Sequence, residues 1–144
     1  MTTDTQAALV QLVQDTTLHS VQFHELHASR KLDIAPDANL DDDPRFTMSM
    51  QTRVDDGELG VRVNLEVDTP VGEIQVVAAA DYINNGPSPS GDVEQRFATE
   101  VGVMVLVPYL RQAVADLSQR VFGTSLLMPI IKREDITSTR VDEA

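Results

Sequence analysis

The sequence predicts an α+β fold, in which a four-stranded antiparallel sheet is followed by a long kinked helix that packs on it. Apolar and polar residues alternate on both sides of the turn Asp55-Asp56-Gly57, which is typical of an antiparallel hairpin. Farther along the chain, the run Val101–Leu110 is apolar on every side. A helix on a single sheet needs only one apolar stripe, so we expect another copy of the chain to cover its other side.

The first strand is expected over residues 18–30. Its apolar side chains change parity between Phe23 and Leu26, and a β-bulge there would return them to one face of the sheet. The next residues, 31–45, contain two prolines and the run Asp41–Asp43, a composition typical of a solvated loop.

The clearest strand pattern follows this loop. Alternation over residues 46–54 and 59–67 predicts the two strands of the hairpin, and Ile74 to Tyr82 predicts a fourth strand. Before the first strand, residues 6–15 have helical spacing, which indicates a short helix in the N-terminal segment 1–17.

A long helix is expected after the Gly-, Pro- and Ser-rich residues 84–91. Its apolar stripe runs from Val93 to Val121, and Pro108 should kink it or divide it because proline lacks a backbone donor. An apolar segment over residues 126–131 follows, and residues 132–144 are polar and expected to be flexible. Residues 1–144 thus form a single domain.

Composition excludes several classes of function. The formal net charge of −12 argues against binding to nucleic acid, which requires clustered Lys and Arg. The chain contains no Cys, which excludes disulfides and thiolate metal sites. No signal peptide and no membrane-spanning segment is visible, so we expect a cytoplasmic protein that does not insert into membranes.

Catalytic and metal-binding patterns are also missing. On a regular strand His24 and His27 point to opposite faces, and even a bulge that reunites them gives only two ligands beside the distant His19. The acidic runs Asp41–Asp43 and Asp55-Asp56 lack the spacing of a calcium loop, and they fall in turns. We therefore expect no enzyme, no metal ion and no cofactor.

The chain is rich in flexible apolar side chains. Met48, Met50, Met104 and Met128 join the apolar segment 126–131. Methionine adapts to irregular partners and is common on promiscuous binding surfaces, although the alternative is that these residues simply pack the core.

The stretch Val107-Pro108-Tyr109-Leu110-Arg111, which continues to Arg120 and is followed by Leu126–Pro129, resembles the SecB signature. In that family a Phe-Pro-Tyr-x-Arg motif opens the long helix, an Arg closes it, and a Leu-x-Pro segment follows. The resemblance covers about residues 18–131, and the preceding strands match the family in order and length. Two departures are visible: Val107 replaces the Phe of the motif, and the second helix of the family is missing or shortened after Ile131.

The resemblance implies an ATP-independent chaperone that forms a homotetramer, a dimer of dimers with helices between the dimers. Its clients would be unfolded polypeptides, held in apolar grooves for export through the SecA motor, or an antitoxin that a divergent SecB-like protein protects. Glu25 falls near a strand acid used in SecA docking. The other acidic docking position falls in residues 76–79, which contain no carboxylate, and this weakens the implied contact with SecA but not holdase activity.

These considerations select two sets of residues. The residues expected to bind peptide are Phe46, Met48, Met50, Leu126, Leu127, Met128, Ile130 and Ile131. The residues expected at the interface between copies are Val101, Met104, Val105, Pro108, Tyr109, Arg111 and Gln112. The alternative hypothesis is a non-enzymatic structural oligomer, or a protein that binds a small ligand on the same scaffold.

Overall fold

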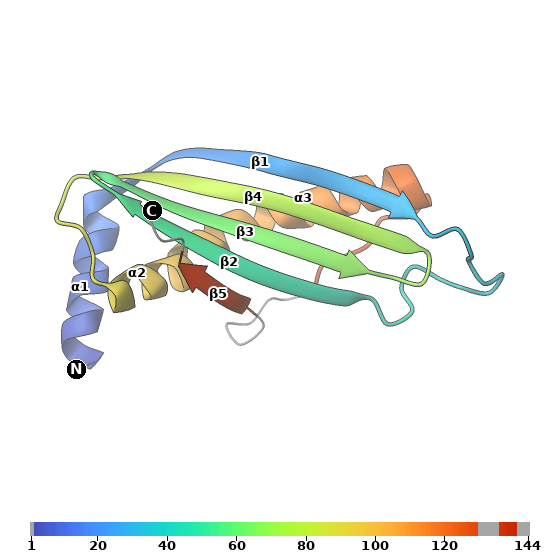
Figure 1. The fold of residues 1–144 in the computed structure, drawn as a ribbon, viewed down its shortest axis with the longest axis horizontal. Coiled ribbons are helices and arrows are strands. Elements are labelled where there is room, and N and C mark those ends of the chain that lie inside the picture. Colours follow the sequence, from blue (N-terminus) through green and yellow to red (C-terminus); the bar gives the residue numbers. More distant parts are fainter. Residues whose placement is uncertain (1, 130–135, 141–144) are drawn as a thin grey trace.

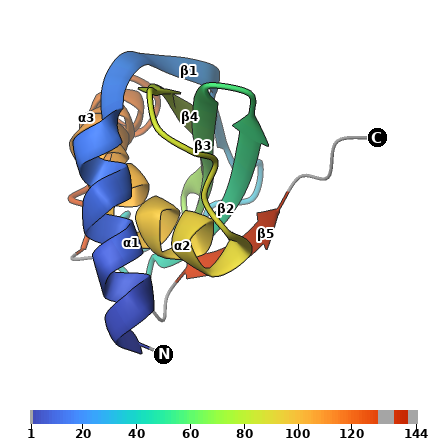
Figure 2. The ribbon, with the colours of Figure 1, turned by 90° about the vertical axis from the view of Figure 1, so that its left-hand side faces the viewer.

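The computed structural model describes residues 2–129 and 136–140, and it shows one curved sheet with its helices on one side (Figures 1 and 2). The strands lie side by side in the order β1-β4-β3-β2-β5, and every pairing except that of β5 is antiparallel. The strands are β1 (Thr16–Arg30), β2 (Arg45–Asp55), β3 (Glu58–Asp68), β4 (Gly72–Asn84) and β5 (Ile136–Arg140). The predicted four-stranded antiparallel sheet is confirmed. The fifth strand is an addition, within the segment that was expected to be a flexible tail.

The bulge expected in β1 is present. The register of β1 against β4 shifts between Phe23 and Glu25, and a second shift lies nearer the start of the strand. As a result Phe23 is opposite Ala78 and Leu26 is opposite Val76, so both apolar β1 residues share the inward face of β4.

The helices cover the inward face of the sheet and one of its ends. The first helix stands at the end of the sheet near the β2–β3 turn, and the long helix runs beneath the strands (Figure 1). Arg96 Nη2 donates to Gln6 Oε1 at 2.8 Å and so joins the two helices that meet at this end. The helical elements are α1 (Thr2–Asp15), α2 (Gly91–Phe97), the π-helical turn η1 (Ala98–Gly102) and α3 (Val103–Phe122).

The irregularity in the long helix lies upstream of Pro108. The helix α3 continues through Pro108, and the π-helical turn η1, which interrupts the α-helical pattern, ends at Gly102, six residues before this proline. At Gly102, the last residue of η1, a Cβ atom would lie 2.6 Å from Cγ2 of Val61 on β3. Only glycine allows the helix to approach the sheet so closely at this point.

The continuous helix Gly91–Phe122 has the length and the mean hydropathy, 1.2, that a membrane-spanning helix needs. In this structure 39% of its apolar window is buried inside the molecule. Packing against the sheet explains why this buried part of the helix is apolar.

The core fills the space between the inward face of the sheet and the helices. Aliphatic residues and methionine dominate it, in agreement with the low aromatic content of 4%. Its largest fully buried side chains are Phe97, Met48, Met50, Leu65, Ile74, Leu106, Leu110 and Met128.

Candidate functional site

The outward face of α3 carries the residues predicted to join copies of the chain. Met104 and Tyr109 on this face are 46% and 41% exposed, whereas Leu106 and Leu110 on the opposite face are fully buried. The helix is therefore apolar on both sides. All seven predicted interface residues keep part of their surface exposed, namely Val101, Met104, Val105, Pro108, Tyr109, Arg111 and Gln112.

A groove of about 480 Å³ lies between α3 and the edge strand β1. Phe23 and Leu26 line it from β1, and Gln112 and Leu117 line it from α3. The ring of Phe23 lies edge-on to that of Tyr109, with the ring centroids 6.5 Å apart. The aromatic residue of the Pro-Tyr-x-Arg motif thus contacts β1 directly and continues the apolar surface from the helix to the edge of the sheet.

Phe23 and Leu26 are surface residues that the sequence analysis did not select. The sequence analysis placed both on one face of the sheet through a β-bulge and made no prediction about their burial. They are 42% and 52% exposed because β1 lies at the edge of the sheet and α3 covers its inward face only in part. An apolar residue on an edge strand can remain exposed even when it faces the helices. The position of β1 at the edge of the sheet is therefore the signal that would have identified these two residues.

The residues predicted to bind peptide fall into different environments. Phe46 is partly buried and Leu127 is 78% exposed, while Ile130 and Ile131 lie outside the described residues. The remaining four are buried in the core, and they are Met48, Met50, Leu126 and Met128.

The burial of these four side chains has a clear structural cause. After α3 the chain returns along the molecule, and Leu126 and Met128 join the same core cluster as Met48 and Met50. The backbone N–H of Leu126 donates to Ser118 Oγ at 2.7 Å, which holds this segment against the helix. The expectation that these residues form an open apolar surface is therefore wrong for this arrangement. Their role in peptide binding stays a prediction.

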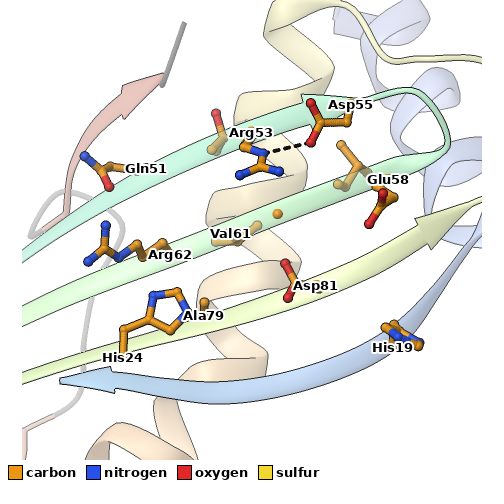
Figure 3. Close-up of a pocket in the computed structure, with 13 residues that line it drawn as sticks. His19, His24, Gln51, Arg53, Asp55, Glu58, Val61, Arg62, Ala79 and Asp81 are labelled. Atoms are coloured by element: carbon orange, nitrogen blue, oxygen red, sulfur yellow. Dashed lines mark hydrogen bonds and ion pairs between the residues drawn. The ribbon is translucent and has the colours of Figure 1, made fainter. Parts of the chain in front are cut away.

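The outward face of the sheet contains a second hollow of about 430 Å³ near the β2–β3 turn (Figure 3). Gly60 and Ala79 line it with little side-chain bulk, and Arg53 Nε donates to Asp55 Oδ2 at 2.7 Å on its rim. Acids and bases are interspersed in it, and the described residues contain no group of three or more side chains that could hold a metal ion. Its charged and titratable residues are His19, His24, Arg53, Asp55, Glu58, Arg62 and Asp81.

Glu25, the predicted docking carboxylate, lies exposed on the outward face of β1. Its partner across the β1–β4 ladder is Val77, which is almost completely buried. The neighbouring position on β4 therefore offers an apolar side chain and no second carboxylate.

A polar group is also buried in the core, at the end of the sheet near α1 and α2. The ring of Tyr82 lies edge-on to that of Phe97, with centroids 5.0 Å apart. Burial raises the pKa of Tyr82 to about 12, because the phenolate would lose its hydration. Nearby, Thr52 Oγ1 donates to the buried carboxylate of Glu94. The ring contact joins β4 to α2, and the hydrogen bond joins β2 to α2.

Comparisons with known proteins agree with this arrangement. Over 130 residues the chain is 27% identical to the SecB-like chaperone SmegB of Mycolicibacterium smegmatis, and the match covers 90% of this chain and 84% of that protein. No family model matches the sequence.

Solved structures extend the likeness to the fold. The fold is similar to that of the Mycobacterium tuberculosis SecB-like chaperone Rv1957, whose structure was solved in complex with a ChAD peptide from the antitoxin HigA1. The TM-score is 0.74 at 18% identity, over 90% of this chain and 97% of that one. A protein of unknown function from Streptococcus agalactiae gives a TM-score of 0.56 at 8% identity, over 80% of this chain and 97% of that one. In sequence and in fold, the chain is similar to SecB-like chaperones.

Proposed function

We propose that this protein is an ATP-independent, non-enzymatic chaperone that holds unfolded or extended polypeptides in an oligomeric assembly. The observation that carries the proposal is apolar surface in excess of what one subunit covers. The largest exposed apolar side chains at the β1 edge and along the outward face of α3 are those of Leu18, Phe23, Leu26, Met104 and Tyr109. The likeness to a curated SecB-like chaperone supports the same function.

In this proposal, one region of the molecule joins copies of the chain and another binds the client. The outward face of α3 and the groove beside β1 join copies of the chain, in a homotetramer built as a dimer of dimers. The side formed by β2 and residues 126–128 receives the client polypeptide. Large exposed apolar patches on a protein mark such interaction surfaces.

An antitoxin is the client that we consider first, because the related structure contains an antitoxin peptide. Export is the second candidate. Transfer of a client to SecA has less support, since Glu25 is opposite Val77 and has no second carboxylate beside it on β4.

Area rather than side-chain specificity would supply the binding energy. At about 25 cal/mol per Å² of apolar area, a client that buries on the order of 1,000 Å² gains about 25 kcal/mol gross. Ordering of the extended client offsets most of this gain, which leaves moderate affinity with little dependence on client sequence.

Light scattering of an aggregating client, with and without the protein and in the absence of ATP, tests this proposal directly. We expect aggregation to be suppressed at one assembly per client molecule. An equal concentration of an inert globular protein of similar charge is the control. Absence of suppression at equimolar assembly would contradict the proposal.

The outward hollow of about 430 Å³ favours a second candidate, a protein that binds a small polar ligand there. This candidate requires no apolar surface that is accessible in the native state. Binding of a hydrophobic dye to the folded protein therefore separates the two, because only the chaperone proposal predicts strong binding.

A further inference from the structure

The strand β5 differs from every other strand of the sheet. It pairs with β2 in parallel, and the ladder joins Met48–Thr52 to Ile136–Arg140. All other pairings among the described strands are antiparallel, and that of β2 with β3 extends over the whole hairpin. β5 is thus a short addition to an edge that the four long strands leave open (Figure 2).

Several properties make β5 the most easily detached strand. Parallel pairing is slightly less stable per residue than antiparallel pairing, and β5 has only one neighbouring strand. Its sequence is Ile-Thr-Ser-Thr-Arg, so Ile136 is its one large apolar residue. Ile136 is only partly buried where it packs on the core.

β5 lies beside two of the predicted peptide-binding residues. It occupies the backbone edge of β2 at Met48–Thr52, next to the buried Met48 and Met50. Phe46, which is partly exposed, lies just outside the stretch that β5 covers. A free edge of this kind accepts another extended chain through backbone hydrogen bonds.

We propose that β5 is a resident occupant of the client-binding edge, and that an extended client segment displaces it and adds to β2 in its place. This inference rests on the proposed function and specifies its binding mode. The preferred client segment is extended and apolar at alternate positions, so that one side chain replaces Ile136 against the core. Backbone pairing requires no particular client sequence.

Competition of this kind lowers the apparent affinity for clients. A client binds only the fraction of molecules in which the edge is open, and its apparent dissociation constant rises by the inverse of that fraction. In the absence of a client, β5 protects the edge from pairing with other copies and from aggregation.

A reversible covalent lock tests the displacement. Ser49 and Thr137 are partners in the β2–β5 ladder, and the chain contains no cysteine of its own. The variant Ser49→Cys/Thr137→Cys can therefore form one disulfide that fixes β5 on β2. The matched control is Thr47→Cys/Glu66→Cys, which bridges β2 to β3 and leaves β5 free.

The probe is reduced, carboxymethylated α-lactalbumin, a permanently unfolded polypeptide, carrying a fluorophore. We expect oxidation of the β2–β5 lock to weaken binding by about tenfold or more, reduction to restore it, and the control bridge to leave it unchanged. Equal binding by the oxidised lock and the parent would overturn the inference. So would an equal loss in the control, since the effect would not then belong to β5.

A second variant releases β5 instead of locking it. Backbone N–H groups of a strand alternate in direction, so one of two adjacent residues donates to β2. Thr137→Pro/Ser138→Pro removes that donor, and Thr137→Ala/Ser138→Ala is the control that keeps it. We expect the proline variant to bind the probe about fivefold more tightly than the alanine control, because a larger fraction of edges is open.

Unchanged or weaker binding by the proline variant would overturn the inference. Binding of the probe by the parent protein is measured first, and it tests the proposed function separately. A parent that binds and does not respond to either variant retains the chaperone function and excludes displacement of β5.

Discussion

The two outer strands of the four-stranded antiparallel sheet, β1 and β2, have similar apolar–polar patterns and opposite surroundings. β1 and β2 both alternate apolar and polar residues, and both place their apolar residues on the inward face. On β1, Phe23 and Leu26 remain about half exposed, whereas Met48 and Met50 on β2 are almost completely buried. The pattern of a strand therefore determines which way its side chains face, and the elements beyond its edge determine whether they are covered.

The elements that cover the two edges differ in kind. α3 packs across β4 and β1 but leaves an open groove beside β1. The β2 side is closed by residues 126–128 and by β5. In the proposed function, a second copy of the chain covers the first edge permanently, and a client replaces part of the cover on the second.

The largest expected effect contrasts one residue from each edge. Met50→Ala should lower the free energy of unfolding by about 2–4 kcal/mol, because it leaves a cavity in a packed core. In a separate subunit, Leu26→Ala should lower it by less than about 1 kcal/mol, because Leu26 is 52% exposed there. Urea unfolding at one protein concentration, low enough to keep the subunits apart, measures both, and equal losses would contradict the difference between the two edges.

A charge at the open edge tests what covers it. Leu26→Glu should raise the dissociation constant of the assembly by about a hundredfold, because a carboxylate would be buried between copies. Leu127→Glu is the matched control, since Leu127 is 78% exposed on the segment that follows α3. Sedimentation velocity over a dilution series measures both. Unchanged assembly of the Leu26→Glu protein would place the contact between copies elsewhere.

Sequence patterns predicted the strands, the bulge and the long helix because each depends on local periodicity. The shift at Phe23 and Glu25, for example, follows from a change of parity within one strand. The burial of Met48 could not be predicted in this way, because it depends on residues about eighty positions later in the chain. β5 was missed for a related reason, since Ile-Thr-Ser-Thr-Arg contains too few apolar residues to show a periodicity.

The pH dependence of stability tests whether the interior between the two edges is closed. The pKa of Tyr82 is raised from 10.0 to about 12 in the folded protein, so the unfolded chain ionises first as the pH rises. Stability is therefore fully present below pH 10 and is lost between pH 10 and 12, by up to about 2 kcal/mol from this residue. Tyr82→Phe should lack this loss when unfolding is followed as a function of pH. A parent and a variant with the same alkaline profile would show that water reaches the Tyr82 hydroxyl.

The smallest expected effect concerns the segment that closes the β2 side. Ser118 Oγ accepts a hydrogen bond from the Leu126 N–H at 2.7 Å, and Ser118→Ala would leave this buried donor without its partner. We expect a loss of about 1–2 kcal/mol in the free energy of unfolding, together with increased binding of a hydrophobic dye to the folded protein. Ser125→Ala is the control, because Ser125 is exposed and its removal should change stability by less than about 0.5 kcal/mol. If Ser118→Ala loses stability but binds no additional dye, residues 126–128 are not the cover of this edge, and β5 alone must close it.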